Sequence, residues 1–259
     1  MGDFRRALAA AAALAGLCTS QAALADGWDL TGGLSLQSDY RFRGISQNDR
    51  QPTPEATLNL LAPDGWYAGT WWAMTDWGIA RPGGGSDNPA VEADFYAGKN
   101  TDLWGTNLNV EAYYYAYPDF SAGGGPRASF FETITQLSRT FGPLAATATW
   151  AWSPQFSLGG GTGNYVGGGL SLPINDWVTL SANLGHQWVQ AAKVALGRGG
   201  DYTHGDIGAT VTYRALSLDL RYVTTDAGKT VCGFYMATAN ACAGGFTGML
   251  SYTFTAASW

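Results

Sequence analysis

The stretch that decides the fold runs from Trp28 to Arg43 and reads WDLTGGLSLQSDYRFR. Its even-numbered positions are mainly apolar or aromatic, whereas its odd-numbered positions carry most of the polar and charged side chains. Successive side chains of a β-strand point to opposite faces, so this segment predicts a strand with one apolar and one polar face. A sheet that spans a bilayer must close on itself, because hydrocarbon offers no partner to a backbone amide. We therefore expect a transmembrane barrel in which the even-numbered side chains of this strand face lipid.

The first 25 residues are typical of an export signal. Arg5 and Arg6 form a short basic region, residues 7–17 are apolar, and Ala23-Leu24-Ala25 provides a small-x-small cleavage site. The apolar run is shorter than the roughly 20 residues that a spanning helix needs. The sequence thus predicts a cleaved Sec signal peptide at residues 1–25 and one barrel domain at residues 26–259, exported to the outer membrane of a Gram-negative bacterium.

The composition favours a sheet and argues against a nucleic-acid partner. There are 36 Gly, 11 Trp, 13 Tyr and 11 Phe, and only 13% of the residues are charged. Without Arg5, Arg6 and Asp3 of the leader, the 14 basic and 20 acidic residues fall to 12 and 19, a formal charge of −7. A protein that binds a duplex needs a basic stripe. Here the basic residues are scattered singly, so no nucleic-acid partner is expected.

Alternating segments recur along the rest of the chain, separated in turn by short and long connections. The pattern predicts an all-β fold, a transmembrane antiparallel up-and-down β-barrel of about 12 strands with short periplasmic turns and long extracellular loops. The expected long loops include residues 77–90, 118–128, 154–164 and 225–244. The expected strands lie near residues 28–43, 54–62, 66–76, 91–99, 106–116, 129–139, 145–153, 165–172, 177–188, 202–213, 216–224 and 245–255.

Strand parity places a set of polar side chains in the lumen. If the first hairpin folds about Asn48, Arg41 approaches Glu55 as a cross-strand pair. An acidic arc facing two arginines would orient dipolar solutes and favour cations. In the alternative reading, these charges only fill a narrow barrel that conducts nothing. The candidate pore-lining residues are Asp39, Arg41, Arg43, Glu55, Glu92, Asp94, Tyr96, Glu111, Tyr113, Glu132, Asp219 and Arg221.

Aromatic side chains near strand ends allow two interpretations. Most of them are expected to form girdles at the membrane interfaces, and the alternative is a set of platforms for sugars. Trp71 and Trp72 are adjacent on one predicted strand, so they face opposite ways and one of them faces the lumen. The residues concerned are Trp66, Tyr67, Trp71, Trp72, Trp150, Trp152, Trp177 and Trp188.

Cys232 and Cys242 fall in the same predicted loop. Exported chains meet an oxidising compartment, so we expect a disulfide between them. A metal site would need more ligands than a cysteine pair, and this loop contains no histidine. No metal and no cofactor are predicted.

His186 and His204 are the only imidazole bases, and neither lies in a recognisable nucleophile motif. His204 is two residues from Asp206 and is expected to face inward, while His186 is expected to face lipid. We therefore predict no catalytic residue and no enzyme. An outer-membrane hydrolase remains the least favoured alternative, after a structural or receptor barrel that acts through its extracellular loops.

Three motifs resemble a known family. Residues 38–47, SDYRFRGISQ, resemble the signature near the mature N-terminus of the TorF porin family. The Glu92-x-Asp94-x-Tyr96-x-Gly98 pattern and the tyrosine run that ends at Pro118 are similar to that family in order and spacing. The resemblance covers essentially all of the chain after the leader. It implies an outer-membrane barrel for passive transport, and it implies neither a solute nor a binding residue.

The expected partners follow from this interpretation. They are outer-membrane lipid, small hydrophilic solutes, and the barrel assembly machinery, which would recognise a C-terminal aromatic residue. Members of the family tend to end at an aromatic residue that closes the last strand, here Phe254, yet five residues follow and end in Trp259. Either aromatic is a candidate, and nothing marks an oligomeric interface. The function expected from the sequence is a porin-like channel for passive diffusion of small hydrophilic solutes, with a mild cation preference.

Overall fold

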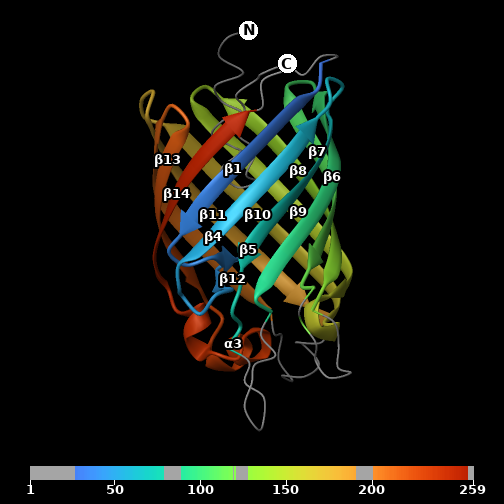
Figure 1. The fold of residues 1–259 in the computed structure, drawn as a ribbon, viewed down its shortest axis with the longest axis vertical. Coiled ribbons are helices and arrows are strands. Elements are labelled where there is room, and N and C mark those ends of the chain that lie inside the picture. Colours follow the sequence, from blue (N-terminus) through green and yellow to red (C-terminus); the bar gives the residue numbers. More distant parts are fainter. Residues whose placement is uncertain (1–26, 79–88, 119, 121–127, 191–200, 256–259) are drawn as a thin grey trace.

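The computed structural model describes residues 27–78, 89–118, 120, 128–190 and 201–255. Within these ranges, twelve antiparallel strands form one closed barrel, as Figure 1 shows, and β1 completes it by pairing with both β4 and β14. The expected fold class and strand count are confirmed. The barrel strands are β1 (Asp29–Gln37), β4 (Thr53–Leu61), β5 (Trp66–Met74), β6 (Val91–Leu103), β7 (Thr106–Ala116), β8 (Phe130–Phe141), β9 (Leu144–Phe156), β10 (Gly161–Pro173), β11 (Val178–Val189), β12 (Tyr202–Tyr213), β13 (Leu216–Thr225) and β14 (Gly245–Thr255).

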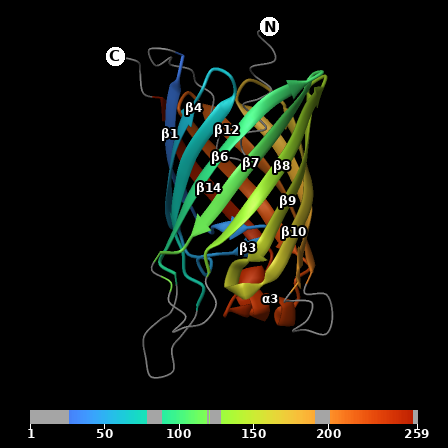
Figure 2. The ribbon, with the colours of Figure 1, turned by 90° about the vertical axis from the view of Figure 1, so that its right-hand side faces the viewer.

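The connections differ at the two ends of the barrel. At the end where β1 begins and β14 ends, tight turns join the strands, and only Arg214 and Ala215 lie between β12 and β13. The opposite end carries the longer connections, including α3 (Lys229–Tyr235) and η3 (Ala239–Cys242) in the segment between β13 and β14 (Figures 1 and 2). Short turns are periplasmic in bacterial barrels, so the end with α3 is the extracellular mouth.

One expected long loop is wrong. Residues 154–164 were expected to connect two strands, but β9 continues to Phe156 and β10 begins at Gly161. The connection is a short one that contains η2 (Ser157–Gly159). The glycines that suggested a loop instead accommodate a register shift between Gly161 and Gly163 at the start of β10. The two triple-glycine segments, 83–85 and 123–125, lie outside the described residues.

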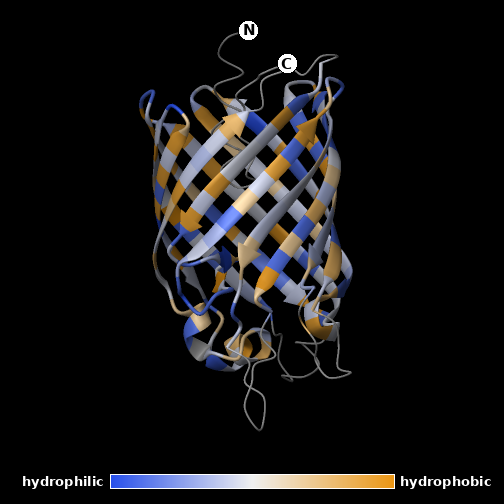
Figure 3. Ribbon diagram, viewed as in Figure 1, coloured by the Kyte–Doolittle hydropathy of each residue, from blue (hydrophilic) through white to orange (hydrophobic). Residues whose placement is uncertain are grey.

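The strands alternate as the sequence pattern requires. In β1, Leu34 and Leu36 lie on the outer face with more than half of each side chain exposed, while Ser35 points inward and donates a hydrogen bond to Glu55 (3.0 Å). The even-numbered side chains of β1 therefore face outward, as predicted. Figure 3 shows the same alternation of hydrophobic and hydrophilic residues around the barrel. None of the helices in the described ranges is long and apolar enough to cross a membrane.

Most of the strand-end aromatic residues form the outer wall. Six of the tryptophans named in the sequence analysis face outward: Trp66, Trp72, Trp150, Trp152, Trp177 and Trp188. Trp71 is the member of the adjacent pair that points inward, and it packs on Tyr40 with ring centroids 5.1 Å apart. Tyr67 also points inward, and its hydroxyl accepts a hydrogen bond from the side-chain amide of Asn109 (2.8 Å). These six tryptophans therefore have the outward orientation that a girdle requires, whereas Trp71 and Tyr67 do not.

The expected first strand, residues 28–43, ends early. The barrel strand stops at Gln37, and residues 38–48, here called the inner segment, fold into the barrel. Within it, β2 (Arg41–Phe42) and β3 (Ile45–Ser46) form a separate two-stranded sheet. The chain reverses at Arg43 and Gly44, which have φ values of 47° and 86°. Positive φ values at two successive residues interrupt an extended strand, and glycine adopts them readily.

Candidate functional site in the lumen

Arg43 reaches across the lumen. The inner segment leaves the barrel between β1 and β4, whereas Arg43 bonds to Glu132 on β8 (2.7 Å) and to Gln187 on β11, on the far side. Its guanidinium lies over the ring of Tyr165, 4.2 Å from the centroid. The side chain of Glu132 is 0% exposed and that of Arg43 is 9% exposed. We call the level at which this Arg43–Glu132 pair crosses the lumen, toward the extracellular mouth, the constriction.

The charge of Arg43 is maintained by its partner. Burial lowers the pKa of this guanidinium, but the charge of Glu132, the hydrogen bond to it and the nearby Tyr115 and Tyr165 together outweigh burial and hold the pKa of Arg43 above its usual value. Tyr40, also in the inner segment, donates a hydrogen bond to Glu92 (3.3 Å). Burial, followed by the charge of Glu92, raises the pKa of Tyr40 well above its ordinary value. Arg43 therefore stays a cation and Tyr40 a hydrogen-bond donor.

The expected pairing of Arg41 with Glu55 is wrong. The hairpin turns at Arg43 and Gly44 rather than at Asn48, so Arg41 is directed toward Asp39 and bonds to its carboxylate (2.8 Å). Arg41 also donates to the carbonyl of Ala243, next to β14 (2.9 Å). Asp39 and Arg41 thus tie the inner segment to the loop that carries the disulfide.

Carboxylates and tyrosines alternate along the wall formed by β4 to β8. Three tyrosines of this wall donate hydrogen bonds to its carboxylates: Tyr113 to Asp94 (2.8 Å), Tyr67 to Glu111 (3.0 Å) and Tyr115 to Glu132 (3.2 Å). One oxygen each of Glu55, Glu92 and Asp94 is buried without a hydrogen-bond partner among the described residues. Buried carboxylate oxygens normally have a partner, so a hydrated or cation-bearing lumen suits this wall.

A ladder of inward-pointing rings follows the same wall, from near the periplasmic turns to the extracellular mouth. Neighbouring ring centroids along it are 6.5, 5.1, 4.5, 4.3 and 4.7 Å apart. The candidate pore-lining residues included only two of its members, Tyr96 and Tyr113, although Tyr115 has the parity of Tyr113 on the same strand and Phe130 has that of Glu132. The ladder consists of Tyr67, Tyr96, Tyr113, Tyr115, Phe130 and Phe156.

A second charged cluster lies on β11 to β13. Arg221 bonds to Asp219 (3.1 Å), to Asp206, and to the hydroxyl of Ser181 (3.1 Å). Asp206 also accepts a hydrogen bond from Asn183 (2.8 Å). The predicted lumen residues Asp219 and Arg221 therefore lie together on the inner face. Asp206 was not among the candidate pore-lining residues, although it has the same parity as His204.

The two histidines show no catalytic arrangement. His204 points inward, and its Nε2 lies 3.1 Å from the hydroxyl of Tyr165. His186 contacts the hydroxyl of Thr203 (2.9 Å) and packs on Trp188. Neither imidazole hydrogen-bonds a carboxylate within the described ranges, so the third group that orients a catalytic base is missing there. The described residues also contain no cluster of three side chains suited to a metal ion.

The segment between β13 and β14 covers the extracellular mouth. Cys232 and Cys242 form a disulfide within it, as predicted. Thr238 of this segment donates a hydrogen bond to Asp49, just after the inner segment (3.0 Å), and the amide of Ala237 donates to the carbonyl of Trp77 (3.2 Å). The disulfide loop is thereby attached to two other loops at the mouth.

Several solved porins have a similar fold. The KdgM porin superposes with a TM-score of 0.53 at 6% identity, and the match covers 87% of this chain and 99% of that one. The NanC porin gives 0.52 at 12% identity, with 88% and 98% covered. A second KdgM structure, described as in complex with disordered oligogalacturonate, gives 0.52 at 3% identity, with 87% and 98% covered. Likeness at such low identity shows the fold, which is that of a bacterial outer-membrane barrel.

The fold and its apolar outer wall place the chain in the bacterial outer membrane. Comparison with curated proteins finds no match. A family model described as "Bacterial protein of unknown function (Gcw_chp)" matches residues 21–254. Because this match spans most of the sequence, the chain belongs to the Gcw_chp family.

Proposed function

We propose that this barrel is a porin-like channel for passive diffusion of small hydrophilic solutes, with a preference for cations. The observation that carries the proposal is the polar, mainly acidic inner wall within a closed barrel. The porin fold and the resemblance of residues 38–47 to the TorF family support it, and assignment to TorF is part of the same proposal.

The cation preference follows from how the lumen charges are paired. Arg41, Arg43 and Arg221 each bond to a carboxylate. Four other carboxylates have no cationic partner among the described residues, and in their ionised form they make the wall negative: Glu55, Glu92, Asp94 and Glu111. A negative wall in a narrow pore attracts cations and repels anions. An acidic sugar polymer such as the oligogalacturonate described for KdgM is therefore not an expected solute.

A second candidate function is a structural or receptor barrel that does not conduct. Its support is the burial of Glu132 and Arg43, whose side chains meet across the lumen at the constriction. Small barrels often fill their interior with paired polar side chains. In this alternative, the loops at the extracellular mouth would carry out the receptor or structural function.

Planar bilayers distinguish the two candidates. Stepwise conductance with a cation-selective reversal potential supports the channel, and Glu111→Gln should reduce that selectivity because it removes one unpaired charge. Asp64→Asn is the matched control, since it makes the same charge change in an exposed periplasmic turn. A folded barrel that stays silent would favour the structural role. Phospholipid hydrolysis by the purified protein, absent from His186→Ala, would indicate an enzyme instead.

Export and assembly are further parts of the proposal. Cleavage after Ala25 and the role of Trp259 concern residues outside the described ranges. Phe254 lies near the end of β14 and packs near Tyr252, with ring centroids 6.4 Å apart. We propose that either Phe254 or Trp259 is the residue that the barrel assembly machinery recognises.

A further inference from the structure

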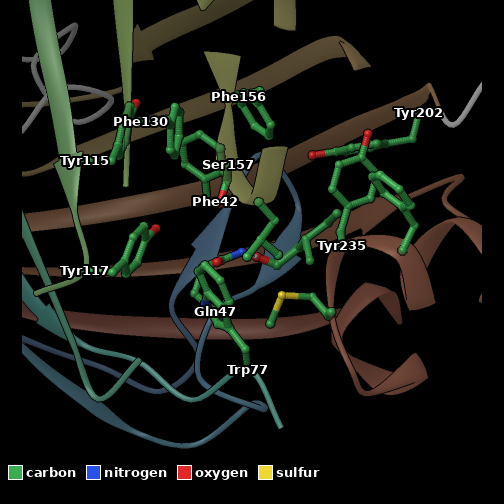
Figure 4. Close-up of a pocket in the computed structure, with 14 residues that line it drawn as sticks. Phe42, Gln47, Trp77, Tyr115, Tyr117, Phe130, Phe156, Ser157, Tyr202 and Tyr235 are labelled. Carbon is green, nitrogen blue, oxygen red and sulfur yellow. Dashed lines mark hydrogen bonds between the residues drawn. The ribbon is translucent and has the colours of Figure 1, made fainter. Parts of the chain in front are cut away.

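An aromatic cavity lies at the extracellular mouth, above the constriction. We call it the mouth pocket, and Figure 4 shows its lining side chains converging from the inner segment, from β7 to β9 and from the disulfide loop. Its volume is about 160 Å³. Most of the lining residues are aromatic, including Phe42, Trp77, Tyr115, Phe130, Phe156 and Tyr235.

The size of the mouth pocket matches a single ring. An apolar protein cavity of about 150 Å³ stays dry and binds benzene. The rings that line this one already contact each other in edge-to-face and stacked arrangements, with Trp77 edge-on to Tyr117 (4.8 Å) and Tyr115 stacked on Phe130 (4.3 Å). Aromatic guests are favoured by the same geometries.

The polar groups of the mouth pocket point to a ligand with few polar atoms. The side-chain amide of Gln47 donates a hydrogen bond to the carbonyl of Ile45 (3.0 Å), and the hydroxyl of Ser157 donates one to the carbonyl of Ala128 (2.9 Å). In contrast, the indole N–H of Trp77 is buried without a hydrogen-bond partner among the described residues. A buried donor without a partner is costly, so a ligand that offers one acceptor would satisfy it.

The same lining disfavours two other ligand classes. No lining side chain carries a formal charge, so a charged group would be buried without a counter-ion in direct contact. A sugar has a hydroxyl on almost every carbon, and the tyrosine, glutamine and serine side chains of this mainly aromatic lining could pair with only some of these hydroxyls.

We propose that the mouth pocket binds one small, uncharged aromatic ring that carries a single hydrogen-bond acceptor, in the manner of a benzyl alcohol. The indole N–H of Trp77 donates a hydrogen bond to the acceptor, and the surrounding aromatic side chains pack against the ring of the ligand. The aromatic ladder begins in this pocket at Phe156, Phe130 and Tyr115 and continues into the lumen. The inference goes beyond the channel for hydrophilic solutes, and binding at this site does not require conduction.

Fluorine NMR on the purified full-length protein in detergent tests the proposal. The probe is para-fluorobenzyl alcohol, and its analogues are para-fluorobenzylammonium, para-fluorobenzoate and a fluorinated glucose. Protein-free micelles correct for partition into detergent. We expect the alcohol to saturate with a dissociation constant on the order of 1 mM, and the charged analogues and the sugar to bind at least tenfold more weakly.

Trp77→Phe keeps a ring in the wall and removes the donor. Loss of one hydrogen bond should raise the dissociation constant of the alcohol by roughly fivefold. Trp150→Phe is the matched control, because it makes the same change on the lipid-facing wall, and it should leave binding unchanged. The indole N–H resonance that disappears in Trp77→Phe should shift when the alcohol is added to the unmodified protein.

Three results would overturn the inference. The first is an alcohol titration that does not exceed partition into micelles, as expected if another part of this chain fills the mouth pocket. The second is equal binding by the fluorinated glucose or by a charged analogue. The third is an equal effect of Trp77→Phe and Trp150→Phe, provided that both variants keep the folded gel mobility.

Discussion

Replacing Arg43 by methionine should destabilise the barrel more than the loss of any exposed arginine. Arg43 donates to both oxygens of Glu132, at 3.1 and 2.7 Å, and Glu132 keeps only the hydroxyl of Tyr115 (3.2 Å) among these contacts. Methionine preserves much of the side-chain volume but leaves a fully buried carboxylate without its cation. Removing one partner of a buried ion pair typically costs about 3–5 kcal/mol, and we expect about 3 kcal/mol because the lumen can admit water.

A double-mutant cycle isolates the contribution of the pair. Glu132→Gln removes the unpaired charge, so the double variant Arg43→Met/Glu132→Gln should recover about 2 kcal/mol relative to Arg43→Met. Urea unfolding in lipid vesicles, followed by tryptophan fluorescence and by gel mobility without heating, gives the free energies. Arg139→Met is the matched control, because Arg139 is exposed at the far end of β8. If Arg43→Met and Arg139→Met cost the same, or the double variant recovers nothing, the buried-pair reasoning is wrong.

Three further predictions concern the turn, the outer wall and the disulfide. Gly44→Ala should cost about 1–2 kcal/mol more than Gly105→Ala in the same unfolding assay. Both glycines have positive φ, but a Cβ at Gly44 would lie 2.6 Å from a side-chain atom of β12, whereas a Cβ at Gly105 would meet open space. Equal costs would mean that backbone strain alone explains both and that the close approach to β12 contributes nothing. Ile207→Arg, near the middle of β12 on the outer wall, should cost about 2–4 kcal/mol in vesicles, and a value near zero would mean that this face is not in lipid. Reducing Cys232–Cys242 should speed proteolysis of residues 226–244, because the bridge limits local opening, while barrel unfolding changes little; an unchanged cleavage rate would contradict this.

The alternation of side chains predicted most of the fold, because a period of two is a direct consequence of extended backbone. It predicted which face of β1 is outward and placed Glu92, Asp94 and Glu111 on one side of their strands. It could not find the end of β1, because Tyr40 and Phe42 continue the alternation that a lipid-facing strand shows. In the inner segment, the same alternation instead packs rings against the lumen wall.

The bonding partners of the lumen residues could not be predicted from the sequence, for a different reason. No local pattern connects Arg43 with Glu132, because their contact is set by how the barrel closes. The opening pattern also gave the wrong partner for Arg41, since it assumed a hairpin about Asn48. The mouth pocket has the same limitation: Trp77, Phe130 and Phe156 are on three segments that only the fold brings together.

The inner segment has a consequence for the order in which the chain folds. Arg43 lies near the start of the barrel, yet its bonding partners are 89 and 144 residues further along the chain. Such distant contacts contribute only after the intervening strands are in register. Tyr40 of the inner segment can meet Trp71 on β5 and Glu92 on β6 before that point. Arg43 cannot reach its native contacts until β8 and β11 are placed, so a residue synthesised early in the barrel is among the last to reach its native partners.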